Sequence, residues 1–293
     1  MFHLLGDPAL KVPLPSNAAE VSSVNPDTLT ALETGGYDGR GLGDAPGAGD
    51  GFVTLSDADR PIIRRYEYQE YSEDVTYTLP GNTLFRGKLS FTSGTFDGSF
   101  ILPKDITAAA GGRLSVYLYG KQVDKLWEGL GLKSGLVFRG GTTNTTDQKG
   151  PLISFGLTGR SVETGDYIPE SGDLLVSLSD PLGINVTGNI GHGIRLWYGE
   201  DEVDAIDVTN GFVYDNGSHT TGSVEFSLAD ALPGELIITA EAWDNANNVT
   251  IKSVTLNITT NEALTLTNVF NYPNPFKGKT QFGFEVNKEA LVE

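Results

Sequence analysis

Cysteine is absent from all 293 residues of the chain, and methionine occurs once. Without a thiol the chain can form neither disulfides nor thiolate metal sites, and it cannot supply a cysteine nucleophile. No run of residues approaches the roughly 18–20 apolar residues that cross a membrane as a helix. The N-terminus also lacks the basic and apolar regions of a signal peptide. An exported parent protein would therefore carry its signal upstream of Met1, and we expect the chain to be a fragment.

Basic charge is scarce, because 20 Lys and Arg face 38 Asp and Glu, for a net charge of −18. Such a surface repels a phosphate backbone, which argues against nucleic acid as a partner. It gives solubility and leaves carboxylates available for a hard cation such as Ca²⁺.

Glycine is abundant, with 37 residues, and together with frequent Thr and Asn it favours turns and strands over helices. Apolar residues alternate with polar ones at Leu174, Val176 and Leu178, and the pattern returns at 193–198. Turn signals recur roughly every 10–20 residues in this half of the chain, which is typical of Ig-like sandwiches. The sequence therefore predicts an all-β protein made of tandem β-sandwich (Ig-like) domains.

Two complete β-domains are expected. Residues 16–51 hold few large apolar side chains, and this composition predicts a linker. Within the first domain, 62–77 is predicted as a half-exposed strand and 126–132 as a short helix weakened by glycines. The expected order is a strand and turn at 1–15, the linker at 16–51, a β-sandwich at 52–140, a connector at 141–150, an Ig-like β-sandwich at 151–260, and a hairpin at 264–293 that begins a truncated β-sandwich.

A turn-rich loop at 180–193 offers the best candidate site. Carboxylate, amide and carbonyl oxygens in turns are the ligands that Ca²⁺ prefers. A calcium site is predicted if this loop and the turn after Trp243 lie at one pole of the sandwich. Its candidate ligands are Asp173, Asp180, Asn185, Asp244 and Asn247. The alternative is that these residues only make Asx-type hydrogen bonds to the backbone of their own turns.

Catalytic residues are not predicted within the chain. His3, His192 and His219 have no histidine or cysteine partner at metal-ligand spacing. A Ser-His-Asp arrangement with His192 or His219 is conceivable, but no Gly-x-Ser-x-Gly elbow supports it. Calcium is the one cofactor that the sequence suggests.

Four stretches, in order along the chain, resemble one protein family. Phe-His-Leu-Leu-Gly-Asp-Pro-Ala-Leu at 2–10 looks like the last strand of the gingipain-type catalytic fold. Phe-Ile-Leu-Pro-Lys-Asp-Ile at 100–106 resembles the F-x-V-P-K-D-I stretch of the β-domain that follows it. The loop at 180–192, with Asp-x-x-Gly-Ile-Asn and Ile-Gly-His, resembles a later part of the same proteins. Asn-Tyr-Pro-Asn-Pro-Phe at 271–276 resembles the opening of the type IX C-terminal domain.

The resemblance is to the region downstream of the catalytic domain in PorU-like gingipain-type cysteine peptidases, the sortases of the type IX secretion system. In that family the catalytic Cys and His lie upstream of the match at 2–10, and the enzyme removes C-terminal signals from cargo and attaches the cargo to a surface anchor. The resemblance implies that 1–15 ends the peptidase domain and 264–293 begins the C-terminal domain.

The same resemblance implies a non-catalytic scaffold and docking region at the outer membrane, on the extracellular face of a bacterial cell. Its expected partners are other type IX secretion components and protein cargo. The chain departs from the family at His192-Gly193, where His-Asp is frequent.

A second function class remains open from the residues. The segment Ala240–Asn248 resembles a strand end common in bacterial Ig-like modules. An adhesion or carbohydrate-binding module would present exposed aromatic platforms, for which Trp127, Trp197 and Trp243 are the candidates. Burial of all three indoles would count against glycan binding.

Overall fold

The computed structural model describes residues 14–69, 71–123, 125–141, 146–170, 172–189, 191–199, 201–229, 231–260, 264 and 266–286. Apart from two 3₁₀ turns, η1 (Glu202–Asp204) and η2 (Thr209–Gly211), the regular structure of these residues is strand, and the expected all-β class is confirmed. Among them no helix has the length and apolar content needed to cross a membrane. The stretch expected to end a peptidase domain, 1–15, lies almost entirely outside the described residues.

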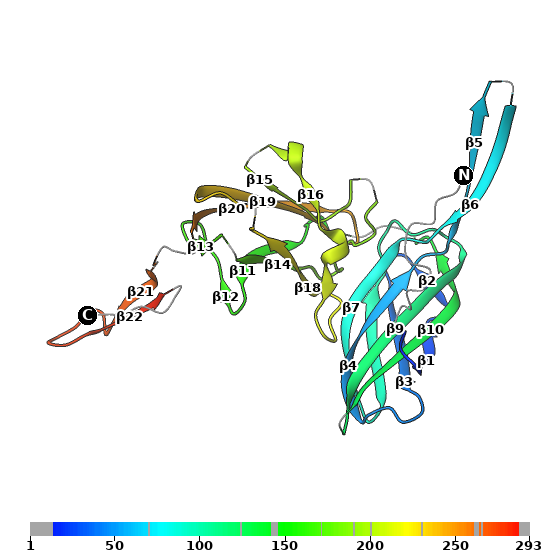
Figure 1. Cartoon of the computed structure of the whole chain (residues 1–293), viewed down its shortest axis with the longest axis horizontal. Helices are drawn as coiled ribbons and strands as arrows, with labels where there is room; N and C mark the ends of the chain where they lie inside the picture. The colour runs from blue at the N-terminus through cyan, green and yellow to red at the C-terminus, as the bar shows by residue number, and fades with distance from the viewer. Residues whose placement is uncertain are drawn as a thin grey trace, which may run out of the picture.

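The N-terminal half closes into a seven-stranded barrel-like sheet (Figure 1). Its strands, in spatial order, are β7 (Thr83–Thr92), β4 (Ala48–Ser56), β9 (Ala110–Gln122), β10 (Lys125–Arg139), β1 (Asn17–Asn25), β3 (Thr34–Gly41) and β8 (Thr95–Ile101). Pairing of Thr92 with Thr95 returns β8 to β7 and closes the ring. A short strand, β2 (Thr28–Thr30), pairs with the end of β10. The expectation of a sandwich in this half is therefore wrong, because its strands form one closed sheet.

The expected linker at 16–51 is also wrong, since it supplies β1, β2, β3 and β4. Gly35, Gly39 and Gly49 of these strands leave room for aromatic rings from neighbouring strands. A Cβ at Gly39 would overlap the Glu20 carbonyl oxygen and the Phe96 ring, and one at Gly35 would overlap the Phe100 ring. Residues 16–51 supply Val21, Leu29 and Tyr37 to the core, and rings from partner strands, which a composition count of 16–51 does not include, fill the space beside the glycines.

The helix expected at 126–132 is the first half of β10, which pairs with β9 from Lys125 to Val137. Trp127, Gly129 and Gly131 alternate inward, where the glycines accommodate the Trp127 ring and neighbouring residues, while Leu130 and Leu132 are exposed outside. Apolar residues on both faces of a strand gave a pattern that resembles a buried helix. The long antiparallel pairing with β9 makes this segment a strand.

The C-terminal half is a sandwich of two sheets. The first contains β12 (Arg160–Ser161), β11 (Leu152–Leu157), β14 (Asp173–Ser179), β18 (Thr221–Ser227) and β17 (Val213–Tyr214), and the second contains β13 (Tyr167–Pro169), β20 (Val249–Thr259), β19 (Gly234–Trp243), β15 (Arg195–Tyr198) and β16 (Ile206–Asp207). The alternating segments expected as strands form β14 and β15. Inward residues such as Val176, Leu196 and Ile238 are fully buried between the sheets.

The barrel and the sandwich share a sheet and a core. Tyr214 of β17 pairs with Gly87 of β7, which joins the first sandwich sheet to the barrel. The rings of Phe85 and Tyr214 stack with centroids 4.7 Å apart, and the buried apolar residues form one cluster through both halves. The sandwich is therefore packed directly on the barrel wall.

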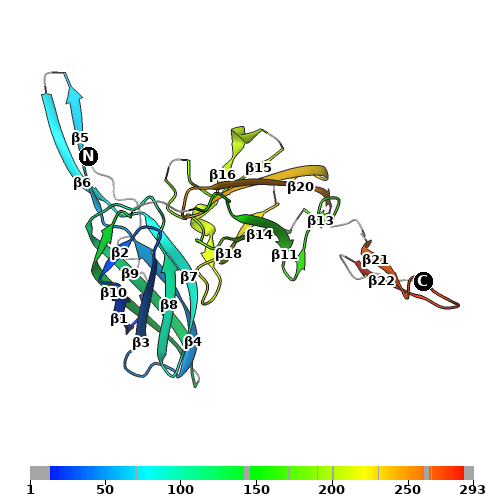
Figure 2. The ribbon, with the colours of Figure 1, turned by 180° about the vertical axis from the view of Figure 1, so that it is seen from behind.

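Two hairpins extend away from these bodies (Figures 1 and 2). The arm, β5 (Arg60–Tyr68) with β6 (Tyr71–Leu79), continues from β4 and returns into β7. It replaces the half-exposed strand expected at 62–77, and nearly all of its residues are exposed on both faces. The tail, β21 (Leu266–Tyr272) with β22 (Gln281–Val286), forms the hairpin expected at the C-terminal end.

Replacing Gly39 by Ala is expected to lower the free energy of unfolding by about 2–4 kcal/mol, because the new methyl group overlaps a backbone oxygen that cannot move freely. Gly47→Ala is the matched control, since a Cβ there meets no atom within 4 Å. Urea unfolding measures both. Equal stability of the two variants would show that the barrel interior does not require glycine at position 39.

Candidate functional site

Three segments meet where the sandwich packs on the barrel, and we call this region the joint. They are the segment between β8 and β9, the loop between β14 and β15, and the turn between β19 and β20. The first, together with the last two residues of β8, contains the Phe-Ile-Leu-Pro-Lys-Asp-Ile stretch, and the second is the loop that the sequence indicated as a site. Two stretches that carry the family resemblance are therefore in contact.

Asn245 connects all three segments. Its side-chain Nδ2 donates to the Ile101 carbonyl at 3.1 Å and to the Leu182 carbonyl at 2.8 Å. Its own carbonyl accepts the Lys104 amide at 2.8 Å, and its amide donates to the Gly183 carbonyl at 3.1 Å. The residue is 1% exposed. Because hydrogen bonds at buried sites are costly to lose, this one side chain fixes the barrel against the sandwich.

Within the Asp-x-x-Gly-Ile-Asn stretch, the glycine has a steric reason. Gly183 has φ +82°, and a Cβ there would lie 2.8 Å from the His219 carbonyl oxygen and 2.9 Å from Tyr214 Oη. The next residue, Ile184, donates its amide to Tyr214 Oη at 2.6 Å and accepts the phenol proton on its carbonyl at 2.8 Å. A glycine with a positive φ is therefore required for the loop to reach the buried tyrosine.

Asp180 and Asp244 each organise their own turn. Asp180 Oδ1 accepts the Leu182 amide at 2.7 Å. Asp244 Oδ1 accepts the amides of Ala246 and Asn248 at 2.9 and 2.7 Å, and its Oδ2 accepts the Asn248 side chain at 2.7 Å. These are the Asx-type bonds that the alternative interpretation of the loop expected.

The same two carboxylates also gather with a third, from Asp147. One oxygen of each lies within 4.8 Å of the others, and Asp180 and Asp244 are 3% and 0% exposed. Burial raises the pKa of the Asp180 carboxyl to about 6, with a smaller contribution from the charges of Asp244 and Asp147. Burial also raises the pKa of Asp244 against the effect of its hydrogen bonds. Such a cluster can share protons or hold a hard cation between its oxygens.

The five candidate ligands do not all converge. Asp180 and Asp244 come together, whereas Asp173 lies at the opposite end of β14, about 23 Å from Asp180 at the usual rise per strand residue. Asn185 Oδ1 accepts both donors of Thr187, at 3.0 and 2.7 Å. Asn247 Oδ1 accepts from Asn185 at 3.2 Å, and its Nδ2 donates to Asp105 at 3.0 Å. The two asparagines therefore serve the joint rather than the carboxylate cluster.

Asp147 was not among the sequence candidates. It stands on the connector that leads into β11, where it has no periodic pattern around it. Its carbonyl accepts the Asn248 side chain at 3.4 Å, which ties the connector to the turn after β19. The position could have been found only by placing the connector beside that turn.

The two described histidines each have one polar partner. His192 Nδ1 lies 2.7 Å from Asp105 Oδ2, and its ring packs edge-on against Trp243 at 4.8 Å. His219 Nδ1 lies 2.8 Å from Ser99 Oγ. The hydroxyl and the carboxylate thus contact different histidines, so these contacts do not form a single Ser-His-Asp arrangement.

The three tryptophans do not form an open platform. Trp127 and Trp197 are 1% and 4% exposed. Trp243 is half-buried, with its ring against His192 and its Nε1 donating to Glu241 at 3.0 Å. The carbohydrate-binding alternative expected these three indoles as exposed platforms, and their full or partial burial counts against it.

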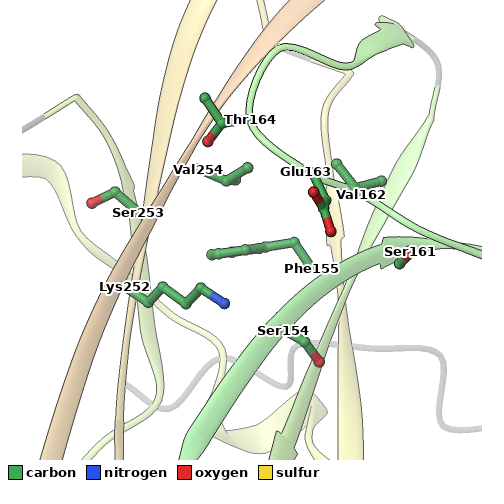
Figure 3. A pocket seen from close by; sticks show the side chains of 9 residues that line it. All are labelled: Ser154, Phe155, Ser161, Val162, Glu163, Thr164, Lys252, Ser253 and Val254. Atoms are coloured by element: carbon green, nitrogen blue, oxygen red, sulfur yellow. The ribbon is translucent and has the colours of Figure 1, made fainter. Parts of the chain in front are cut away.

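A hollow of about 260 Å³ lies at the open side of the sandwich, between β11 and β20 (Figure 3). Phe155, Val162 and Val254 line it, and Lys252 and Glu163 are its charged residues. Lys252 Nζ donates to the Ile153 carbonyl at 2.9 Å, so the lysine bridges the two sheets. The hollow is slightly below the size range of ordinary ligand pockets.

No protein-family model matches the chain, and a search of curated proteins finds no match. Among solved structures, the crystal structure of dimeric latent PorU from Porphyromonas gingivalis is similar over 97% of this chain and 28% of that chain, at 23% sequence identity and a TM-score of 0.49. This chain therefore spans only 28% of that neighbour's length.

Two further structures overlap less well. A tetra-tandem repeat from the extending region of a large adhesion protein is similar over 87% of this chain and 51% of its own, at 12% identity and a TM-score of 0.23. The sporulation control protein Spo0M from Bacillus subtilis is similar over 81% of this chain and 90% of its own, at 12% identity and a TM-score of 0.24. At these overlaps the three likenesses assign no activity and no partner to the chain.

Asp180→Asn is expected to remove a pH dependence of stability. Because the folded pKa of about 6 exceeds the ordinary value of 3.8, the folded chain binds more protons than the unfolded chain between these values. The free energy of unfolding should therefore fall as pH rises through this window, by up to about 3 kcal/mol for this group. Urea unfolding at several pH values measures it, with the exposed Asp173→Asn as control. Identical pH profiles for wild type and Asp180→Asn would contradict the argument.

Calcium is expected to stabilise the fold if the carboxylate cluster binds it. A roughly tenfold excess of Ca²⁺ over its dissociation constant contributes about 1.4 kcal/mol, which raises Tm by about 2–4 °C. The comparison is between chelator and millimolar Ca²⁺, in wild type and in Asp147→Asn, which should lose the shift. An unchanged wild-type Tm would leave the carboxylates as turn residues alone.

Proposed function

We propose that the chain is the non-catalytic β-domain region of a PorU-like type IX secretion C-terminal signal peptidase, and that it acts as a scaffold and docking module at the bacterial cell surface. The supporting observation is that the stretches 100–106 and 180–192, which carry the resemblance, interlock through Asn245 at the joint. A rigid joint between two β-bodies is what a spacer between a catalytic domain and a C-terminal domain requires.

The arm supplies a surface suited to docking. In an antiparallel pair, directly opposed residues project from the same face. One face, which we call the aromatic face, carries Ile62, Tyr66, Tyr68, Tyr71, Val75, Tyr77 and Leu79, with Arg60, Arg64 and Glu73. The other, the polar face, carries Pro61, Ile63, Arg65, Glu67, Ser72, Asp74, Thr76 and Thr78.

The aromatic face has the composition of an interface centre. Tyrosine and arginine are enriched at such centres, where tyrosine contributes apolar area and a hydrogen-bonding group together. Tyr66, Tyr68 and Tyr71 are 52%, 75% and 64% exposed. A two-stranded hairpin is marginal by itself in water, so a partner that covers this face would also stabilise the arm. We propose other type IX secretion components at the outer membrane as that partner, with protein cargo as the substrate of the parent enzyme.

The test replaces Tyr66, Tyr68 and Tyr71 by Ser in the complete parent protein, in cells that secrete type IX cargo. Loss of three aromatic contacts should reduce removal of C-terminal signals from cargo at least about tenfold, since each hot spot contributes a large part of the binding energy. The matched control changes Ile63, Arg65 and Thr76 on the polar face to Ser and should process cargo normally. The amount of protein at the cell surface is measured in parallel.

Normal processing in the aromatic variant, at normal surface level, would refute docking through the arm. An equal loss in the polar-face control would show that the arm matters only as a folded hairpin.

A further inference from the structure

Asparagine is followed directly by glycine at two places in the chain, Asn210-Gly211 and Asn216-Gly217. Such a pair is prone to a spontaneous rearrangement, because glycine has no side chain to shield its nitrogen from the asparagine side-chain carbonyl. Both asparagines are exposed to solvent. The two pairs therefore differ mainly in how the fold holds the peptide group between asparagine and glycine.

The first pair is held in a hydrogen-bonded turn. Asn210 and Gly211 belong to η2, where the Gly211 amide donates to the Val208 carbonyl at 2.9 Å. The Asn210 carbonyl accepts Arg86 Nη1 at 2.6 Å, so the peptide group that joins the two residues is bonded at its nitrogen and at its oxygen. These bonds must open before the Gly211 nitrogen can react.

The second pair lies at the tip of the loop between β17 and β18. The Ser218 amide donates to the Asp215 carbonyl at 3.0 Å across this turn, and Gly217 has φ +69°, which glycine adopts at little cost. Within the described residues, no hydrogen bond engages the Gly217 amide. The Gly217 nitrogen is therefore available to lose its proton and approach the neighbouring side chain.

We propose that Asn216 and Gly217 form a self-modifying site, at which the chain converts its own asparagine to an acid. The Gly217 nitrogen forms a bond to the Asn216 side-chain carbonyl carbon, the bond from that carbon to Nδ2 breaks, and the amide proton leaves with this nitrogen as ammonia. Water then opens the cyclic succinimide to aspartate or isoaspartate. The reaction consumes only water, and it is independent of the partner proposed above.

The conversion acts on a contact between the sandwich and the barrel. Asn216 Nδ2 donates to Ser90 Oγ of β7 at 2.9 Å, and the Ser90 hydroxyl donates its own proton to Asp50 Oδ1 of β4 at 2.7 Å. An ionised aspartate at position 216 has no proton to donate to Ser90, and its charge adds to that of Asp50. The modified turn is therefore repelled from the barrel wall, to a modest extent because these groups are exposed.

The test incubates the whole chain in mildly alkaline buffer and follows both asparagines by peptide mass spectrometry, since the amide and the acid differ in mass. In the folded chain Asn216 should convert at least about tenfold faster than Asn210, whose peptide group must first open. In urea the two rates should come within about threefold of each other, because both pairs then lie in unfolded chain.

Equal conversion of the two asparagines in the folded chain would overturn the proposal. So would a ratio in urea as large as in the folded chain, because the neighbouring residues rather than the fold would then select Asn216.

A second measurement tests the effect on the barrel. Hydrogen exchange of β17, which pairs with β7 through Tyr214 and Gly87, should be about threefold faster in Asn216→Asp than in wild type at low salt. Asn210→Asp adds the same charge at the other pair and should exchange as wild type does. Combining Asp50→Asn with Asn216→Asp should remove most of the difference, because one of the two charges is then gone. Unchanged exchange in Asn216→Asp would overturn the assigned effect on the barrel.

Discussion

A buried amide that must find partners determines how the two halves of this chain are arranged. Asn245 donates to one carbonyl from the barrel and one from the sandwich, and its backbone bonds both halves again. Shifting the sandwich by even a fraction of a residue would leave the Ile101 and Leu182 carbonyls without this donor in a site that water does not reach. Such unsatisfied groups cost about 1–3 kcal/mol each, which is a large part of the stability of a typical domain. Apolar contacts such as that between Phe85 and Tyr214 add buried area, but by themselves they would allow the sandwich to slide along the barrel.

The aspartates beside this amide are placed under competing requirements. The turn hydrogen bonds favour ionised carboxylates, because the oxygens of Asp180 and Asp244 accept backbone amides at short distances. The burial that accompanies tight packing favours the neutral acid instead, and raises both pKa values. A nearby third carboxylate, Asp147, adds to the cost of charge. Protons or a cation can each relieve this conflict, and the two remedies respond differently to pH and to chelators.

Much of the fold could be predicted from the sequence where a strand has one buried and one polar face. The alternation of Leu174, Val176 and Leu178 predicted β14, and the similar pattern at 193–198 predicted β15. Such reasoning failed at 16–51 because glycines occupy inward positions there and rings of other strands fill the space beside them, and at 126–132 because the inward Gly129 lies beside the Trp127 ring of the same strand. The composition of a short segment does not show which side chains will pack against its glycines. Barrel closure depends on pairing between distant strands.

For the candidate site, the sequence indicated the loop at 180–193 and two of the three clustered carboxylates, those of Asp180 and Asp244. It missed Asp147, whose position depends on where the connector passes, and it included Asp173, which is at the wrong end of its strand. It could not reveal that Asp105 of the barrel reaches His192, since 87 residues of chain separate the two along the sequence. Gly193 directly follows this histidine in the chain, and the carboxylate beside the ring, that of Asp105, comes from the barrel.

The attachment of the arm has a mechanical consequence. Only three residues join each of its strands to β4 and to β7, so a pull on the tip acts on both barrel strands through two short connections. β4 is paired along its length with β9, and β7 with β4 on one side. A pull along these strands therefore loads the hydrogen bonds between β4, β7 and β9 in shear. In this geometry all of the bonds resist at the same time instead of breaking one by one. β7 is also the strand that pairs with β17, and Arg86 on it bonds the Asn210 carbonyl at 2.6 Å. Tension applied by whatever holds the arm therefore reaches the sandwich directly, through the backbone of a single strand.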